Sequence, residues 1–177
     1  MQFFSIAILS FVLLVLFMAE KKYLGYCGLY CGDCLGRTGV IAEAAGNFLN
    51  VLDKYEFEKT AFSVFPSKLS GYDDLIDMLM FMENLRCTRF CREFDGGESQ
   101  CTVRECCVEH GYITCNSCES FENCEKLEQV LGGLHLEACR KNLREINKMG
   151  LDKWLIEGRK HHYWDRDNIC DDPNGYC

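Results

Sequence analysis

Residues 86–124 read RCTRFCREFDGGESQCTVRECCVEHGYITCNSCESFENC, and this stretch limits the folds that the chain can adopt. Its 39 residues include eight cysteines and eleven charged residues, but only seven other large apolar side chains. Fixing one residue costs about 1–2 kcal/mol of backbone entropy, and so little apolar surface cannot offset that cost. We therefore expect covalent or coordinate bonds between the cysteines to hold this stretch together.

The spacing of the cysteines favours metal coordination over disulfide bonds. Two pairs, Cys31–Cys34 and Cys115–Cys118, are each separated by two residues. This spacing lets two thiolates reach one ion from a tight turn. Cys87–Cys91 is a looser pair within the range found for metal ligands. Several further thiols lie close by in the sequence, which makes the pattern much stronger than a single pair would be.

Zinc is the metal that we expect, and it would be structural. A four-thiolate zinc site contributes an apparent ~10–16 kcal/mol, against about 5–15 kcal/mol for the stability of a whole domain. Two alternatives stay open. Thiolates also bind iron, so the protein could carry an iron–sulfur cluster. An exported chain would instead form disulfide bonds.

The composition of the whole chain limits its function further. The 177 residues carry a formal net charge of −8, and no run of Lys or Arg exceeds two residues. Nucleic-acid binding is therefore not expected, because it depends on neutralising phosphates with basic side chains. No nucleophile–base pair and no phosphate-binding loop stand out, so the sequence predicts no reaction and names no partner.

Residues 3–18 form an apolar run in which only two serines are polar. As a helix this run spans about 24 Å, which is short for a bilayer core of roughly 30 Å. Three interpretations remain: a misassigned start upstream of Met18, a marginal membrane anchor, or a signal peptide. The first two place the cysteines in the cytoplasm, which we favour, and contact with a membrane is expected only if residues 1–17 belong to the protein.

Apolar residues recur at helical spacing along most of the remaining chain, and no alternating strand pattern occurs. We expect a mainly α, small single-domain fold with irregular cysteine-rich, metal-bound knuckles. The domain is expected to span residues 18–165, between the hydrophobic segment 1–17 and a polar tail at 166–177. Thr38 is the expected cap of the first helix. The expected helices cover residues 40–58, 70–85, 102–110, 120–131, 135–149 and a last segment from Leu151.

The motifs CGLYCGDC at 27–34, LRC at 85–87, CTVRECCVEHGYITCNSCESFENCEKLE at 101–128 and NLREINKMGLDKWL at 142–155 together resemble the prokaryotic domain of unknown function 3795. The similarity runs from about Tyr23 to Trp154. It implies a cytosolic, metal-binding protein and no assigned activity. Its pattern implies ten metal ligands: Cys27, Cys31, Cys34, Cys87, Cys91, Cys101, Cys106, Cys115, Cys118 and Cys124.

The chain departs from the family pattern at two places. Three residues separate Cys87 from Cys91, where two are usual, and Asn123 stands where the family has proline. These departures leave open the geometry of the second pair and of the turn before the last cysteine.

The other polar and sulfur-containing residues near these motifs have simpler expected roles. Cys107 and Cys139 are expected to pack as buried thiols, and His110 to lie exposed at a helix end. His161 and His162 are expected at a solvated helix end. Four arginines are expected to offset thiolate charge: Arg86, Arg89, Arg92 and Arg104.

Overall fold

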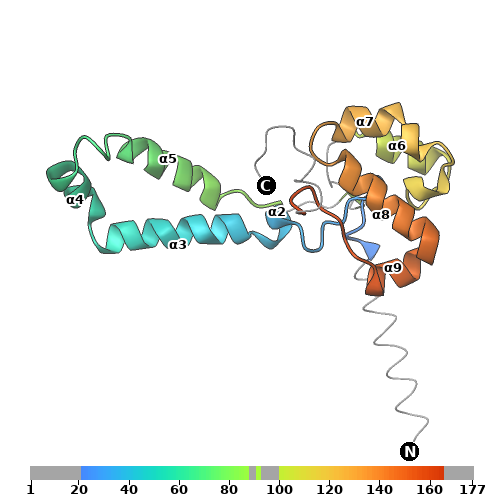
Figure 1. Cartoon of the computed structure of the whole chain (residues 1–177), viewed down its shortest axis with the longest axis horizontal. Helices are drawn as coiled ribbons and strands as arrows, with labels where there is room; N and C mark the ends of the chain where they lie inside the picture. Colours follow the sequence, from blue (N-terminus) through green and yellow to red (C-terminus); the bar gives the residue numbers. More distant parts are fainter. Residues whose placement is uncertain (1–20, 88–90, 93–99, 166–177) are drawn as a thin grey trace, which may run out of the picture. The chain divides into compact units, whose positions relative to one another are not determined.

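The computed structural model describes residues 21–87, 91–92 and 100–165, and this part of the chain is mainly helical (Figure 1). It contains eight α-helices, two short 3-10 helices and no strand, apart from one isolated bridge between Leu24 and Tyr30. The prediction of a small, mainly α fold is confirmed. The segments 1–17 and 166–177 and Arg89 lie outside the described residues. None of the helices in the described ranges is both long and apolar enough to cross a bilayer.

The chain forms two compact units. Among the described residues, unit 1 comprises 21–32, 91–92 and 100–165, and unit 2 comprises 33–87. Unit 2 consists of α2 (Leu35–Thr38), α3 (Val40–Lys54), α4 (Phe57–Val64) and α5 (Tyr72–Glu83). Helices α3 and α5 pack along each other. Their shared core is small: Ala45, Leu52, Ala61, Tyr72 and Leu79.

Two predictions for unit 2 are wrong in detail. The helix expected over residues 40–58 ends at Lys54, because Glu56 adopts a left-handed conformation with φ of 46° before α4 begins. Thr38 does not cap α3, since Gly39 occupies the N-cap position. The Thr38 hydroxyl instead donates to the carbonyl oxygens of Cys34 and Leu35 at 3.1 and 3.3 Å, closing α2.

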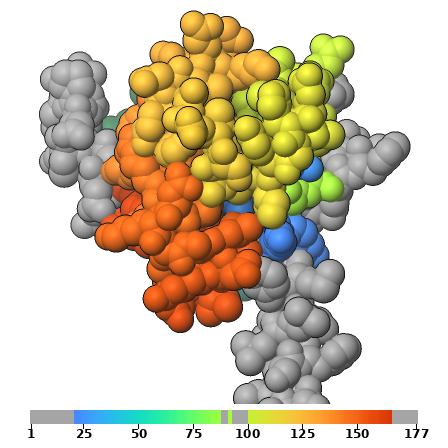
Figure 2. All heavy atoms as spheres, turned by 90° about the vertical axis from the view of Figure 1, so that its right-hand side faces the viewer, coloured from blue at the N-terminus to red at the C-terminus, as the bar shows by residue number. Residues whose placement is uncertain are grey.

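Unit 1 consists of α6 (Thr102–Glu109), the 3-10 helices η1 (Cys115–Ser117) and η2 (Phe121–Asn123), α7 (Glu125–Leu131), α8 (Leu136–Met149) and α9 (Leu151–Glu157). Figure 2 shows one face of this unit, where η1 in yellow adjoins α8 in orange. The amphipathic α8 contributes to two buried clusters. Cys139 and Leu143 belong to the first cluster, which also contains residues of α6 and α7. Ile146 belongs to the second cluster, which also contains Trp154 of α9.

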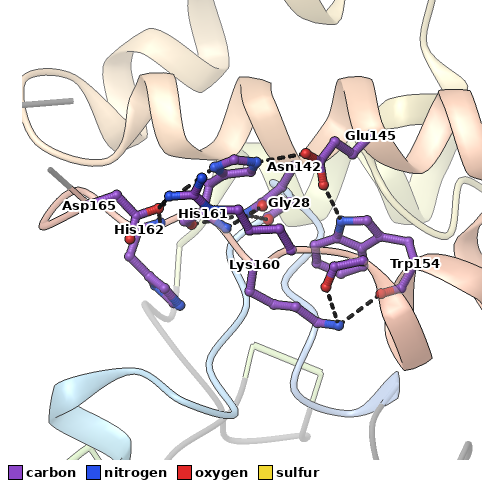
Figure 3. A network of polar contacts seen from close by, with 10 residues as sticks. Gly28, Asn142, Glu145, Trp154, Lys160, His161, His162 and Asp165 are labelled. Carbon is purple, nitrogen blue, oxygen red and sulfur yellow. Dashed lines mark hydrogen bonds and ion pairs between the residues drawn. The ribbon is translucent and has the colours of Figure 1, made fainter. Parts of the chain in front are cut away.

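The segment after α9 is held against α8 by the fully buried Asn142 (Figure 3). Its amide donates to the carbonyls of Gly28 and His161 at 2.9 and 3.1 Å, and its oxygen accepts from the His161 backbone N–H at 2.8 Å. The Lys160 ammonium donates to three carbonyls at the end of α9. Residues 158–165 are therefore anchored by buried polar contacts.

The expectation of a solvated helix end at His161 and His162 is wrong, because the two residues are only 9% and 6% exposed. The Nε2 atom of His161 lies 2.8 Å from Oε1 of Glu145. The ring of His162 stacks on Trp164, with 4.2 Å between the ring centroids. His161 and His162 therefore contact Glu145 and Trp164 instead of solvent.

Candidate metal centre

Cysteines from separate segments of unit 1 converge on one buried core. Cys107 of α6, Cys115 of η1 and Cys139 of α8 are buried within it. Three further cysteines are partly buried and pack against the same core: Cys27, Cys101 and Cys124. This core is where the structure concentrates sulfur.

The loop that carries Cys27 is a tight turn fixed to its surroundings. The Gly25 N–H donates to the Leu29 carbonyl at 2.7 Å, and Gly28 has φ of 92°, which favours glycine. A β-carbon on Gly28 would lie 2.7 Å from Cγ of Leu143, so the loop approaches α8 closely. The Cys115 N–H donates to the Tyr26 carbonyl at 2.8 Å, which joins this loop to η1.

The buried thiols form two pairs. The Sγ atoms of Cys107 and Cys115 lie 3.5 Å apart, and the thiols of Cys27 and Cys139 are hydrogen-bonded to each other. The hydrogen bond from Cys139 lowers the pKa of Cys27, and burial raises the pKa of Cys139. The hydrogen bond between Cys107 and Cys115 lowers the pKa of Cys107 and raises that of Cys115. One sulfur of each pair is thus biased toward the thiolate.

Of the four arginines expected to offset thiolate charge, Arg92 and Arg104 lie within electrostatic range of thiols in this unit. The Arg92 guanidinium donates to the carbonyls of Leu24 and Ile113 and lies over the Tyr26 ring, 4.3 Å from its centroid. Its positive charge adds to the hydrogen bond from Cys139 in lowering the pKa of Cys27. Burial raises the pKa of Cys91, and the charge of Arg104 opposes that shift. Arg86 belongs to unit 2, where its side chain lies against Gly39.

Five of the ten predicted ligands lie at or beside the thiol core. Four of them belong to the core or pack against it: Cys27, Cys115, and Cys101 and Cys124 at the N-cap positions of α6 and α7. The fifth is Cys91. Burial raises its pKa most, and the charges of Cys27 and Cys101 raise it further. Two of the four cysteines that were not nominated as ligands, Cys107 and Cys139, are buried as expected and belong to this core.

The other five predicted ligands lie elsewhere or at the margin. Cys34 and Cys87 belong to unit 2, where the Cys87 N–H donates to the Gly36 carbonyl at 2.8 Å. Cys106 places its Sγ 3.9 Å from Nδ1 of the exposed His110. Cys31 and Cys118 are partly buried, and neither belongs to the core around Cys107.

Four sulfurs of the described chain form the two pairs above, and none of the described sulfurs is gathered with others around a point. Within residues 21–87, 91–92 and 100–165, no group of three or more His, Cys, Asp or Glu side chains is arranged to hold a metal ion. One buried polar atom beside the core has no hydrogen-bond partner in this part of the chain, the hydroxyl of Thr114. It neighbours Cys115 in the sequence, and a thiolate sulfur is an acceptor that could satisfy it.

No curated protein and no solved structure matches this chain. A family model described as "Protein of unknown function (DUF3795)" matches residues 23–129, which is more than half of the chain. The match includes the Cys27 loop, unit 2, α6 and both 3-10 helices, whereas α8 and α9 follow it. The resemblance seen in the cysteine motifs is confirmed, and the chain belongs to the DUF3795 family of proteins of unknown function.

Proposed function

We propose that this protein binds structural zinc through clustered thiolates in unit 1 and acts as a binding or scaffold module. The observation that carries the proposal is the 3.5 Å separation of the buried Sγ atoms of Cys107 and Cys115. With Zn–S bonds of about 2.3 Å, two sulfurs on one edge of a tetrahedron lie about 3.8 Å apart. The pair is therefore close to the spacing that zinc requires.

The surroundings of Cys115 suggest which sulfurs complete the site. The hydrogen bond with Cys107 raises the pKa of Cys115 most, and burial has the next largest effect. The charges of Cys107, Cys27 and Cys124 raise it further. The thiols of Cys107, Cys27 and Cys124 therefore lie within electrostatic range of Cys115, although the four sulfurs are not gathered around one point in the described chain. We assign Cys27, Cys107, Cys115 and Cys124 as the first ligand set. The remaining predicted ligands are candidates for a second ion.

The electrostatics of this region favour a cation. The hydrogen bond with Cys107, and then burial, raise the pKa of Cys115, and burial raises the pKa of Cys139, so both thiolates are disfavoured. A zinc ion that replaces the protons removes this penalty, and a four-thiolate site then carries net charge −2. The guanidinium of Arg92 would offset part of that charge.

Elemental analysis and a visible spectrum of the full chain, purified without oxygen, test the proposal. Colourless protein with bound zinc that unfolds when a chelator removes the metal is the expected result. Brown protein containing iron would favour the iron–sulfur alternative. Metal-free protein with few titratable thiols would favour disulfide bonds and would overturn the proposal.

A further inference from the structure

Unit 2 exposes more large apolar side chains than its helices bury. Of the sixteen large apolar residues that are exposed in the described chain, eleven lie between Val40 and Leu85. Tyr55 and Phe81 are each 68% exposed. One of these eleven residues, Met80, also lines a groove on this unit.

A groove of about 790 Å³ lies on this unit between the second half of α3, the start of α4 and one face of α5. All of its lining residues belong to unit 2. Its apolar wall includes Leu49, Phe57, Ile76 and Met80. The α5 residues that line it recur at positions 72, 73, 76, 77, 80 and 83, which is one stripe along the helix.

Carboxylates surround this apolar wall. Six acidic side chains line the groove: Asp53, Glu56, Glu58, Asp73, Asp77 and Glu83. The one lysine of the lining, Lys59, is paired with Glu56, with 2.6 Å between Nζ and Oε2. Asp73 and Asp77 are four residues apart on α5, a spacing at which like charges destabilise a helix. The groove therefore favours a ligand that is both apolar and positively charged.

We infer that this groove binds an amphipathic helix of a partner protein, with apolar side chains in the groove and Lys or Arg along its flanks. Helices dock into such grooves through apolar side chains at i, i+3, i+4 and i+7, and the α5 stripe has the matching period. Charge complementarity identifies the occupant. Residues 33–88 contain nine acidic and five basic residues, a net charge of −4, so a second copy would be repelled. Nucleic acid and anionic lipid are disfavoured for the same reason.

This inference deepens the binding role proposed above by naming the class of partner, but its site lies in unit 2 and contains no proposed zinc ligand of the first set. Its test is therefore separable from the metal analysis. If the groove variants keep the zinc content of the wild type and lose the partner helix, the groove is supported. If the protein contains no zinc but still binds the helix at the groove, only the metal proposal fails.

The probe is a fluorescently labelled, amidated peptide of about four helical turns, made only of Leu and Lys with the Leu residues on one face. Binding to the full chain is measured by fluorescence anisotropy at low and at physiological salt. We expect saturable binding that weakens with salt. The same peptide with every Lys replaced by Glu should not bind.

Two pairs of matched variants locate the binding site. Asp73→Asn removes a charge that lines the groove. Asp74→Asn removes the charge of the neighbouring exposed aspartate, which does not line the groove. Met80→Ser removes an apolar groove residue that is 48% exposed, and Met78→Ser removes a methionine outside the groove that is 57% exposed. We expect Kd to rise about fivefold in Asp73→Asn and about tenfold in Met80→Ser, with less than about twofold change in the controls.

Circular dichroism of all four variants establishes that the helices remain formed. No binding by the peptide would overturn the inference, as would equal losses in groove and control variants. Self-association of the full chain that Met80→Ser abolishes would assign the groove to a second copy and overturn it too.

Discussion

The Sγ atom of Cys107 lies 3.5 Å from that of Cys115, whereas the neighbouring Cys106 turns its sulfur toward His110. Adjacent residues of a helix point about 100° apart, so only one of the two cysteines in α6 can face Cys115. The family pattern nominates Cys106, and the structure places Cys107 at the buried pair. The two thiols can be distinguished by experiment.

We predict that Cys107→Ser reduces the bound zinc by about one ion per chain, because a serine hydroxyl does not replace a thiolate ligand. Elemental analysis of protein purified with and without added zinc measures this. Cys106→Ser is the matched control and should retain the wild-type zinc content. Equal losses in both variants would refute the assignment of Cys107 to the first ligand set.

Helices α3, α5, α6 and α8 could be predicted from periodicity because each buries residues on one face. The helix expected over residues 70–85 is observed at Tyr72–Glu83, and the one expected over 102–110 at Thr102–Glu109. The break between α3 and α4 could not be predicted, since it depends on a left-handed Glu56, a conformation that glutamate rarely adopts. The sequence contains no glycine or proline there to indicate a break.

The site could be predicted less completely than the helices. Motif spacing identifies thiols that are close in sequence, but the hydrogen-bonded pair Cys27 and Cys139 is separated by more than a hundred residues. Only packing of α8 brings these two together. A signal was present for Cys139, which falls on the apolar stripe of α8 with Leu143 and Ile146. The burial of His161 depends on Asn142 and Glu145, which periodicity alone does not reveal.

We predict that Gly28→Ala lowers the free energy of unfolding by about 2–4 kcal/mol. The left-handed backbone costs an alanine about 1–2 kcal/mol, and overlap with Leu143 adds to this. Gly111→Ala is the control, since Gly111 also has positive φ, but a β-carbon on it would meet no other atom of the described chain within 4 Å. Urea unfolding of both variants measures the difference. Equal losses would show that the Cys27 loop does not contact α8 this closely.

We predict that Asn142→Ala lowers the free energy of unfolding by about 3–5 kcal/mol. It removes three hydrogen bonds and leaves the Gly28 carbonyl and the His161 peptide groups buried without partners, at about 1–3 kcal/mol each. Asn147→Ala is the control, because Asn147 is exposed and its side chain accepts a hydrogen bond from Asn116 at the surface. The free energy of unfolding of this variant should fall by no more than about 0.5 kcal/mol. Equal urea midpoints for the two variants would contradict the anchoring role of Asn142.

We predict that His135 makes the protein less stable as the pH falls below about 6.5, the ordinary pKa of histidine in an unfolded chain. Burial lowers the pKa of His135 in the folded protein, and the charge of His162 lowers it further. Above that pH the imidazole is neutral in both states, and its contribution to stability is complete. Below it the unfolded chain takes up a proton that the folded protein resists, so the free energy of unfolding decreases until the folded pKa is reached.

Urea unfolding of the wild type and of His135→Gln, measured at intervals from about pH 8 to about pH 5, isolates this effect because all other titrating groups are shared. The two curves should run parallel above about pH 7, which serves as the internal control. Below about pH 6.5 the wild type should lose stability more steeply than the variant. If the curves stay parallel to the lowest pH, the edge-to-face contact of His135 with Tyr163, at 5.0 Å between ring centroids, does not exclude the proton and the burial argument fails.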